Sequence, residues 1–488
     1  MIKQQASLTP PYPYTLALIA FAYFTINMLA QYLVSPTADL DQAEQLLVSQ
    51  YFQWGYSEQP PLYTWLVASL FSITGPSLLT LLLFKACLLG SLVACLLGIG
   101  AHLRFNNSQL LIVLCSLVFI PQIIWESQRD LTHSVLVTLI AAASLLQVIR
   151  TQQHPSQLNH LLLGGLIGLG LISKYNFIIY LGGLLLTCLC IQEYRRVLFQ
   201  PKGLFLSLLT ATVIALPHAL WAFNHIEIAL GSVHKLAISN SGAWHSVAKA
   251  MIAALAYLSP LWILALLLLG KKATYDNQVS HTHRQLLLYL ALGILAMVLL
   301  FTLLTETQKI KDRWYQPLLF FIPLLIAAFA RPSLKRLKIY QGIAVFFALL
   351  VMLVLSLRTI LVDEFGHSSR PNMPYTAAIQ EISTQIPLPK LILADGKLLA
   401  GNARSIFQAS HIDSPKYSIK SIIPTGTALV LCETKDCGKN NFKDWLFHRY
   451  HIKTDTLSLK ALERPFYYSD SHTKTIYWAT VNLKNIKQ

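Results

Sequence analysis

Long apolar segments recur along the first three quarters of this 488-residue chain, and they constrain its fold more than any other feature. Hydrophobic residues make up 54% of the sequence and charged residues only 12%. A helix of about 20 apolar residues crosses the roughly 30 Å hydrocarbon layer of a bilayer. The pattern therefore predicts a polytopic α-helical membrane protein rather than a soluble globular one.

Eleven segments are long and apolar enough to be read as membrane spans, with ten or twelve as alternatives because the fifth and sixth are short and closely coupled. They cover residues 14–34, 78–103, 109–125, 132–149, 161–174, 176–192, 203–222, 247–270, 285–304, 315–330 and 339–361. The first segment lacks a small-residue cleavage site, so we expect it to remain as a helix.

Lysine and arginine indicate the orientation, because they concentrate in the short cytoplasmic loops of membrane proteins. The basic clusters Arg195-Arg196-Lys202, Lys271-Lys272-Arg284 and Arg331-Lys335-Arg336-Lys338 all fall on the side of the N-terminus. That side is expected to be cytoplasmic, and an odd number of spans puts the C-terminal segment in the periplasm of a Gram-negative cell. Topology also explains much of the net charge of +16, which therefore does not indicate nucleic-acid binding.

The composition changes near Asp363, after which apolar runs are too short to span a bilayer. We therefore predict two domains, a transmembrane domain at 1–362 and a small soluble α/β domain at 363–488. Strands are predicted at Lys390–Asp395, Ala428–Cys432 and Thr475–Val481, and helices at Tyr375–Ile386 and Leu398–Gln408.

Two cysteines, Cys432 and Cys437, lie in this exported segment within the sequence CETKDC. A disulfide between them is expected in an oxidising compartment. A zinc site would need further ligands at suitable spacing, and none is seen.

Acidic residues of the membrane part gather on the predicted outer face. Residues 1–362 contain eleven, of which only Glu193 and Asp276 fall on the cytoplasmic side. The first outer loop, about 35–77, is too long for a simple connector. It is predicted to form two surface helices, Gln45–Trp54 and Leu62–Ile73, the second of which starts at a proline pair.

Asp41 and Glu44 in that loop are three residues apart, so on a helix they share a face. One interpretation is functional, because carboxylates held at a membrane surface accept protons in catalysis. The other is that Asp39 or Asp41 caps the following helix. Both roles can coexist.

Three further outer segments carry polar groups. Trp125–His133 contains Asp130, although Arg129 could simply neutralise its acidic neighbours. Gly168–Phe177 contains Lys174, which could snorkel to the interface or bind an anion. Thr305–Pro317 places three cations on the outer side, against the usual charge bias.

Together these segments offer carboxylates for proton abstraction and cations for a phosphate group. A reaction that transfers a group from a lipid phosphate would use both. The chain contains no nucleotide-binding glycine loop, HExxH or GxSxG, which disfavours a nucleotide-driven pump and the commonest hydrolases.

An ordered set of motifs resembles the bacterial family 39 glycosyltransferases, which include the lipid A aminoarabinose transferases and are related to protein O-mannosyltransferases. The motifs are Asp41-Gln-Ala-Glu44, Trp54-Gly-Tyr with Pro60-Pro-Leu, Asp130, Gly170-Leu-Ile-Ser-Lys-Tyr-Asn176, Pro217…Trp221…Asn224 and Arg313-Trp-Tyr-Gln-Pro317. The resemblance covers nearly the whole chain, but it is loose after residue 363, where only Leu391–Asp395 matches. It implies a GT-C fold and a polyprenyl-phosphate-linked sugar donor used on the outer face.

The resemblance also implies residue roles. Asp41 would be the catalytic base, and Asp130 would orient acceptor or donor sugar. The donor phosphate would be bound by Lys174 and Arg313, with Lys85 as a third candidate, and substrate would contact Glu44, Tyr175 and Trp314. The family commonly carries an Asp-Glu pair, and here Gln42 stands where the glutamate would be, so a role of a second carboxylate in sugar or metal binding is not implied for that position. Glu44, one helical turn away, is a candidate substitute.

The sequence thus predicts a glycosyltransferase of the inner membrane that moves one sugar from a polyprenyl phosphate to an acceptor at the periplasmic surface. Lipid A or another lipopolysaccharide component is the leading acceptor by analogy. No cofactor is expected to be required, and the need for a divalent metal stays open. The competing interpretation is a transporter or flippase for polyprenyl-linked lipids, without covalent chemistry.

Overall fold

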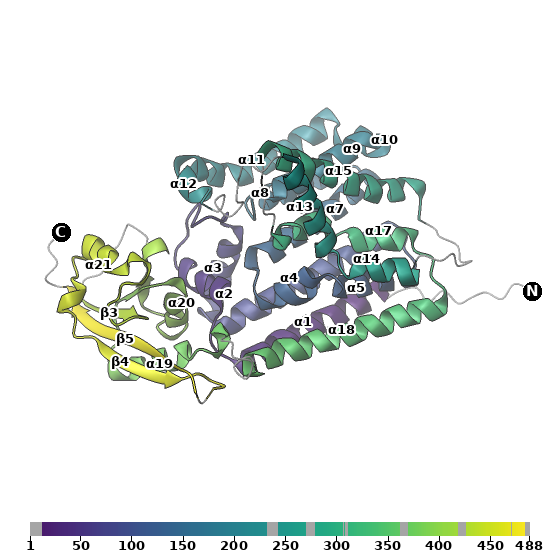
Figure 1. Ribbon diagram of the computed structural model, residues 1–488. Coiled ribbons are helices and arrows are strands. Elements are labelled where there is room, and N and C mark those ends of the chain that lie inside the picture. The colour runs from purple at the N-terminus through teal and green to yellow at the C-terminus, as the bar shows by residue number, and fades with distance from the viewer. Residues whose placement is uncertain are drawn as a thin grey trace, which may run out of the picture. The chain divides into compact units, whose positions relative to one another are not determined.

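The computed structural model describes residues 12–231, 243–269, 279–305, 307, 311–361, 369–417, 426–469 and 471–483 (Figure 1). The chain forms two compact units. The first unit comprises Met1–Ile26, Ser57–Leu62 and Lys85–Met352, and the second comprises Asn27–Tyr56, Tyr63–Phe84 and Leu353–Gln488. This grouping differs from a single division at residue 362, because residues 27–56 and 63–84 belong with the C-terminal sheet. The predicted features at Lys271-Lys272, Asp276, Glu306, Lys309 and Asp363 lie outside the described residues.

Among the described residues, six helices are long and apolar enough to cross a membrane, or up to nine if each bent pair is one span. The six are α1 (Tyr12–Val34), α4 (Leu78–His102), α7 (Thr132–Gln153), α11 (Pro201–Asn224), α15 (His281–Thr305) and α18 (Leu334–Leu361). The bent pairs are α5 (Asn107–Val118) with η1 (Gln122–Glu126) and α6 (Ser127–Arg129), α9 (Phe177–Cys190) with α10 (Gln192–Leu198), and α13 (Ala243–Tyr257) with α14 (Leu261–Leu264) and η3 (Ala265–Leu269).

Each of the eleven predicted spans falls on a helix, but two of them fall on shorter apolar helices. These are α8 (Gln157–Leu171) and the pair α16 (Gln316–Leu319) and α17 (Ile322–Phe329). The described part of the chain therefore supports a polytopic helical protein, and the number of crossings stays a prediction. Further short helical segments are α12 (Ile226–Ala229), η4 (Asp312–Trp314), η6 (Arg370–Asn372), η7 (Pro415–Tyr417), η8 (Lys439–Asn441) and η9 (Thr454–Thr456).

Small residues set the helix spacing within the first unit. On α8, a Cβ atom added at Gly164 would lie 2.2 Å from the carbonyl oxygen of Ser207 on α11. Glycine therefore permits this approach, as is common where apolar helices pack without a hydrophobic driving force between them. The outward side of α11 carries exposed apolar side chains such as Phe205 and Val213, as expected of a helix that faces lipid.

The second unit contains a five-stranded sheet of order β2-β1-β3-β5-β4. Its strands β3, β5 and β4 are labelled in Figure 1. Its strands are β1 (Leu391–Ala394), β2 (His411–Asp413), β3 (Thr427–Cys432), β4 (Lys460–Pro465) and β5 (Thr473–Asn482). β1 pairs in parallel with β2 and β3, whereas β5 is antiparallel to β3 and β4. β1, β3 and β5 coincide with the three predicted strands.

Helices cover both faces of this sheet. α19 (Tyr375–Gln385) and α20 (Lys397–Ile406), both near their predicted positions, pack on the face that carries Ile392 and Leu429. α21 (Phe442–Tyr450) packs on the opposite face, against Leu391 and Val430. β1 is buried on both sides, which explains its uninterrupted apolar sequence. At the end of β3, Cys432 is bonded to Cys437.

The loop at about 35–77 contributes two helices, α2 (Leu40–Val48) and α3 (Leu62–Thr74). The second begins directly after the proline pair, as predicted. The predicted helix at 45–54 is wrong in its bounds, because α2 starts five residues earlier and ends at Val48. Leu47 of α2 belongs to the same apolar core as α19 and α20. α2 is therefore a structural part of the sheet-containing unit.

Candidate active site

In the first unit, Lys85 on α4 is fixed to the turn that precedes α7. Its side chain is 1% exposed, and its Nζ donates a hydrogen bond of 2.7 Å to the backbone carbonyl of Asp130. The turn is unusual, because Leu131 has a φ of 60°, a left-handed conformation that costs roughly 1–2 kcal/mol for a residue with a side chain. Strain of this kind is common at functional sites.

Lys174, in the connection between α8 and α9, reaches the same segment of chain. Its side chain is 9% exposed, and its Nζ donates to the Ser134 hydroxyl over 2.6 Å. The lysine is thus buried rather than snorkelling. Two lysine side chains are thus held on the short segment 130–134, which also carries the Asp130 carboxylate, and charges in a poorly solvated place act more strongly than in water.

The same connection also contacts the segment 305–317. The side-chain amide of Asn176 donates to the carbonyl of Trp314 in η4 over 3.1 Å. Arg313 beside it is half-buried, and Trp314 packs near the ring of Phe301. Within this unit the structure therefore links, through neighbouring contacts, the segments that carry Lys85, Asp130, Lys174, Tyr175, Arg313 and Trp314.

Ser134 and Asn176 were not singled out from the sequence. Asn176 closes the motif that contains Lys174, so its position in the motif was a usable signal. Ser134 lies inside an apolar helix and gives no such signal, because helical serines commonly bond their own backbone.

Tyr175 leads into a stack of aromatic rings along α11. Its ring lies 5.9 Å from that of His218 at 21°, followed by Trp221 and then His225 at similar small angles. His218 and Trp221 are three positions apart on α11, which places them on one helix face, and His225 follows directly after the helix ends. His218 and His225 were missed in the sequence, where this spacing was the available signal. Flat stacked rings of this kind can pack against a sugar ring or a prenyl chain.

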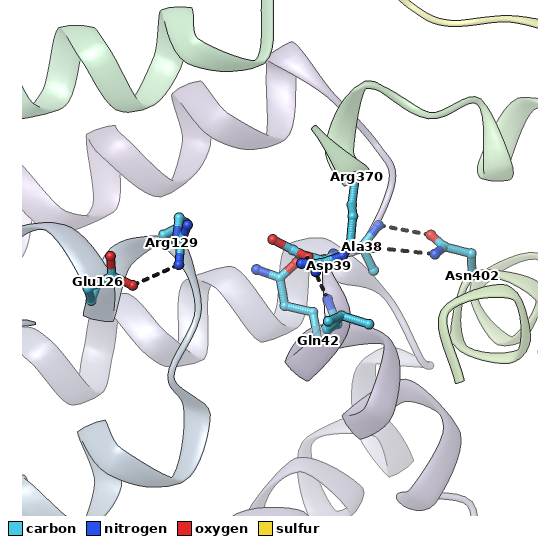
Figure 2. Close-up of polar contacts among 8 residues, drawn as sticks. Ala38, Asp39, Gln42, Glu126, Arg129, Arg370 and Asn402 are labelled. Atoms are coloured by element: carbon cyan, nitrogen blue, oxygen red, sulfur yellow. Dashed lines mark hydrogen bonds and ion pairs between the residues drawn. The ribbon is translucent and has the colours of Figure 1, made fainter. Parts of the chain in front are cut away.

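Arg129 has a local role. Its guanidinium pairs with the Glu126 carboxylate at 2.9 Å, and both side chains are partly exposed (Figure 2). The charge-neutralising interpretation of this segment therefore holds for Arg129 and Glu126. An exposed pair three residues apart on a helix contributes only a few tenths of a kcal/mol.

In the second unit, Asp39 is the N-cap of α2. Its side chain accepts from the backbone of Gln42, while the Asp39 backbone N–H donates to Gln42 Oε1 over 2.9 Å, which forms a capping box (Figure 2). Arg370 also pairs with Asp39 at 2.9 Å. The capping alternative is therefore satisfied by Asp39 and not by Asp41. Gln42, which replaces the family's glutamate, is occupied in the cap.

Glu44 is held by the C-terminal domain. Its Oε2 pairs with Nζ of Lys397 and accepts a hydrogen bond of 3.1 Å from the hydroxyl of Tyr417. Nearby, the backbone N–H of Ala38 donates to Oδ1 of Asn402 over 2.8 Å (Figure 2). These contacts fix both the start and the middle of α2 against α20.

Asp41 differs from its two acidic neighbours. Its side chain is half-buried, and it forms no hydrogen bond or ion pair with any residue that the structure describes. Asp39 and Glu44 are engaged in holding the helix, so Asp41 is the carboxylate of α2 that remains available to accept a proton. In the described ranges, no group of three or more histidine, cysteine, aspartate or glutamate side chains is placed to hold a metal ion.

Comparison of fold and sequence defines the class of protein. Residues 58–221 match the family model described as Dolichyl-phosphate-mannose-protein mannosyltransferase. The fold aligns with ArnT from Cupriavidus metallidurans bound to undecaprenyl phosphate, with a TM-score of 0.60 and 13% identity, over 95% of this chain and 97% of that one. This is the fold of a GT-C membrane glycosyltransferase.

Two sequence relatives make the assignment more specific. The lipopolysaccharide core galacturonosyltransferase RgtB of Rhizobium johnstonii is 31% identical over 412 residues, 82% of this chain and 83% of the relative. RgtA of the same organism is 28% identical over 421 residues, 84% of this chain and 83% of the relative. The chain belongs to this glycosyltransferase family, within the ArnT and protein mannosyltransferase superfamily, which confirms the resemblance seen in its motifs.

Proposed function

We propose that this enzyme transfers one sugar from a polyprenyl-phosphate donor to a lipopolysaccharide component at the periplasmic face of the inner membrane. The observation that carries the proposal is the pair of buried lysines, Lys85 and Lys174, that bond to the segment 130–134. The family membership supports the transfer of a sugar. The aligned ArnT structure, which holds undecaprenyl phosphate, supports a lipid-phosphate donor.

The cations have a direct role in this chemistry. Lys85, Lys174 and Arg313 bind the donor phosphate and neutralise the charge that develops on it as the sugar departs. A hydrogen bond between charged groups contributes about 1.5–3 kcal/mol, and it acts most strongly where water is excluded. Both lysines are buried before the donor arrives, so their positions are set in advance.

Asp41 is the proposed base. The acceptor oxygen attacks the anomeric carbon and forms the new C–O bond, while the bond from that carbon to the phosphate oxygen breaks. Its electron pair leaves with the polyprenyl phosphate, and the acceptor proton passes to the Asp41 carboxylate. Asp130 orients the acceptor or donor sugar, and Tyr175 and Trp314 pack against the sugar or the prenyl chain.

The names of RgtA and RgtB support galacturonic acid as the sugar and the lipopolysaccharide core as the acceptor. The test is a transfer assay with the full chain in lipid nanodiscs, undecaprenyl-phosphate galacturonic acid and purified lipopolysaccharide. Mass spectrometry should show a gain of one hexuronosyl unit, and undecaprenyl-phosphate aminoarabinose serves as the pentosyl comparison. A folded protein that transfers neither sugar would contradict the proposal.

The periplasmic assignment has its own test. Reporter fusions at Lys338 and Lys390 should report opposite compartments, cytoplasmic and periplasmic respectively. The same compartment at both positions would refute it.

A further inference from the structure

The sheet of the second unit has an edge at which three parallel strands end together. β1 lies between β2 and β3, so the chain passes from β1 to β2 on one side through α20 and then returns to β3 on the other. In α/β sheets, ligands bind outside the carboxyl ends of the strands where the connections diverge in this way. Asp395 follows β1 at this edge, and Ser414 follows β2.

A cleft of about 480 Å³ lies at this edge. Its lining residues are Asp395, Gly396, Lys397, Ser414, Pro415, Lys416, Tyr417 and Asn441. The volume falls within the roughly 300–1,000 Å³ typical of small-ligand sites. The cleft is thus large enough for a sugar ring with its substituents.

The lining has the chemistry of a site for an anionic sugar. Lys416 and Lys397 supply two cations, of which Lys397 also pairs with Glu44, and Asp395 adds a carboxyl group. Lysine ammonium groups of this kind pair with a phosphate or carboxylate. Ser414, Tyr417 and Asn441 supply the hydroxyl and amide groups that hydrogen bond to sugar hydroxyls.

The cleft is also connected to the helix that carries the proposed base. Lys397 and Tyr417, both in its lining, bond to Glu44 on α2, three residues after Asp41. α2 lies so close to α20 that a Cβ atom at Gly401 would be 2.1 Å from the carbonyl oxygen of Ala43. Cleft and base therefore belong to one packed unit.

We propose that this cleft binds an anionic sugar of the acceptor glycan and so holds the acceptor on the same unit as Asp41. The assignment of the sugar to an acceptor rests on the proposed function. The binding of an anionic sugar in the cleft does not.

The test measures binding of two probes, glucose 6-phosphate and galacturonic acid, to the full chain in lipid nanodiscs by saturation-transfer NMR and calorimetry. Glucose and inorganic phosphate are the comparison ligands. The cleft is proposed to contact both the charged group and the hydroxyl groups of the sugar, whereas glucose lacks the first and inorganic phosphate lacks the second. At least one probe should therefore bind saturably and more tightly than either comparison ligand. Equal binding of inorganic phosphate, or no saturable binding of either probe, would overturn the proposal.

The variant Lys416→Ala tests whether the probes bind in the cleft. Lys416 is exposed, so its truncation should leave the fold intact, and it should weaken probe binding by about tenfold or more through loss of a charge-assisted contact. Lys453→Ala, at an exposed lysine outside the lining, is the matched control and should bind as wild type does. Equal affinity in both variants would overturn the location.

The transfer assay separates the two proposals. Lys416→Ala should raise the KM for lipopolysaccharide more than it lowers kcat. Probe binding without transfer from any polyprenyl donor would remove the proposed function but keep the cleft as a sugar site. Normal transfer without probe binding would remove the cleft alone.

Discussion

Replacing Asp41 by asparagine tests the proposed base with little disturbance of the structure. Asp41 is the second residue of α2, and its side chain has no hydrogen bond or ion pair with the described residues. Stability should therefore lose only the attraction between one carboxylate and the helix N-terminus, about 0.3–1 kcal/mol. We expect expression and melting temperature close to those of the wild type.

The kinetic effect of Asp41→Asn should be far larger. A positioned general base accelerates a reaction by about 10²–10⁴-fold. Losing it raises the activation free energy by about 3–5 kcal/mol. The quantity to measure is the initial rate of sugar transfer in nanodiscs at saturating donor and acceptor, together with donor affinity, which should change little.

The matched control is Asp39→Asn, two residues away on the same helix. Asparagine caps a helix about as well as aspartate, so α2 should still begin at Leu40. The ion pair with Arg370 is lost, but the arginine side chain is 46% exposed, and such pairs contribute at most about 1 kcal/mol. Normal turnover in Asp41→Asn, or an equal loss in both variants, would refute the assignment of the base.

Three further outcomes are expected. Lys174→Met should lower kcat/KM for the donor by about tenfold or more, because a charge-assisted contact to phosphate is lost; an unchanged value would contradict the phosphate role. Mass spectrometry of unreduced, alkylated protein should find neither Cys432 nor Cys437 modified, and alkylation of both would exclude the disulfide. Burial raises the pKa of Asp395 from 3.8 to about 6, so the folded state binds this proton more tightly than the unfolded state and loses stability as pH rises across that interval. Hydrogen–deuterium exchange of β1 should be slower in Asp395→Asn than in wild type at about pH 7 but not at about pH 4; an equal difference at both would contradict this.

Elements encoded by local patterns could be predicted from the sequence. α4 nearly coincides with the span expected at 78–103, because a continuous apolar run of that length has few alternatives. β1 was found in the same way, as a short apolar run bounded by polar residues. The start of α3 followed from the proline pair before it.

The position of α2 could not be predicted in this way. Apolar residues become frequent only after Glu44, so the apolar pattern alone places the helix at 45–54, although the sequence also offers Asp39 or Asp41 as its cap and places Asp41 and Glu44 on one helix face. The helix is extended by its capping box and by partners that lie 331 and 353 residues further along the chain, Arg370 and Lys397. Contacts so distant in sequence have no local signature, although the aspartate and glutamine three residues apart were a usable capping signal.

These long-range contacts assign a role to the C-terminal domain. α2 buries Leu47 in the core of that domain, and Lys397 pairs with Glu44 on the helix. Arg370 and Asn402 hold Asp39 and Ala38, directly before the helix begins. A helix of nine residues is too short to be stable in water by itself, so its position depends on this packing. The domain that follows the membrane helices is therefore part of the structure that holds the proposed base in place, because the helix carrying Asp41 has its buried face in that domain's core.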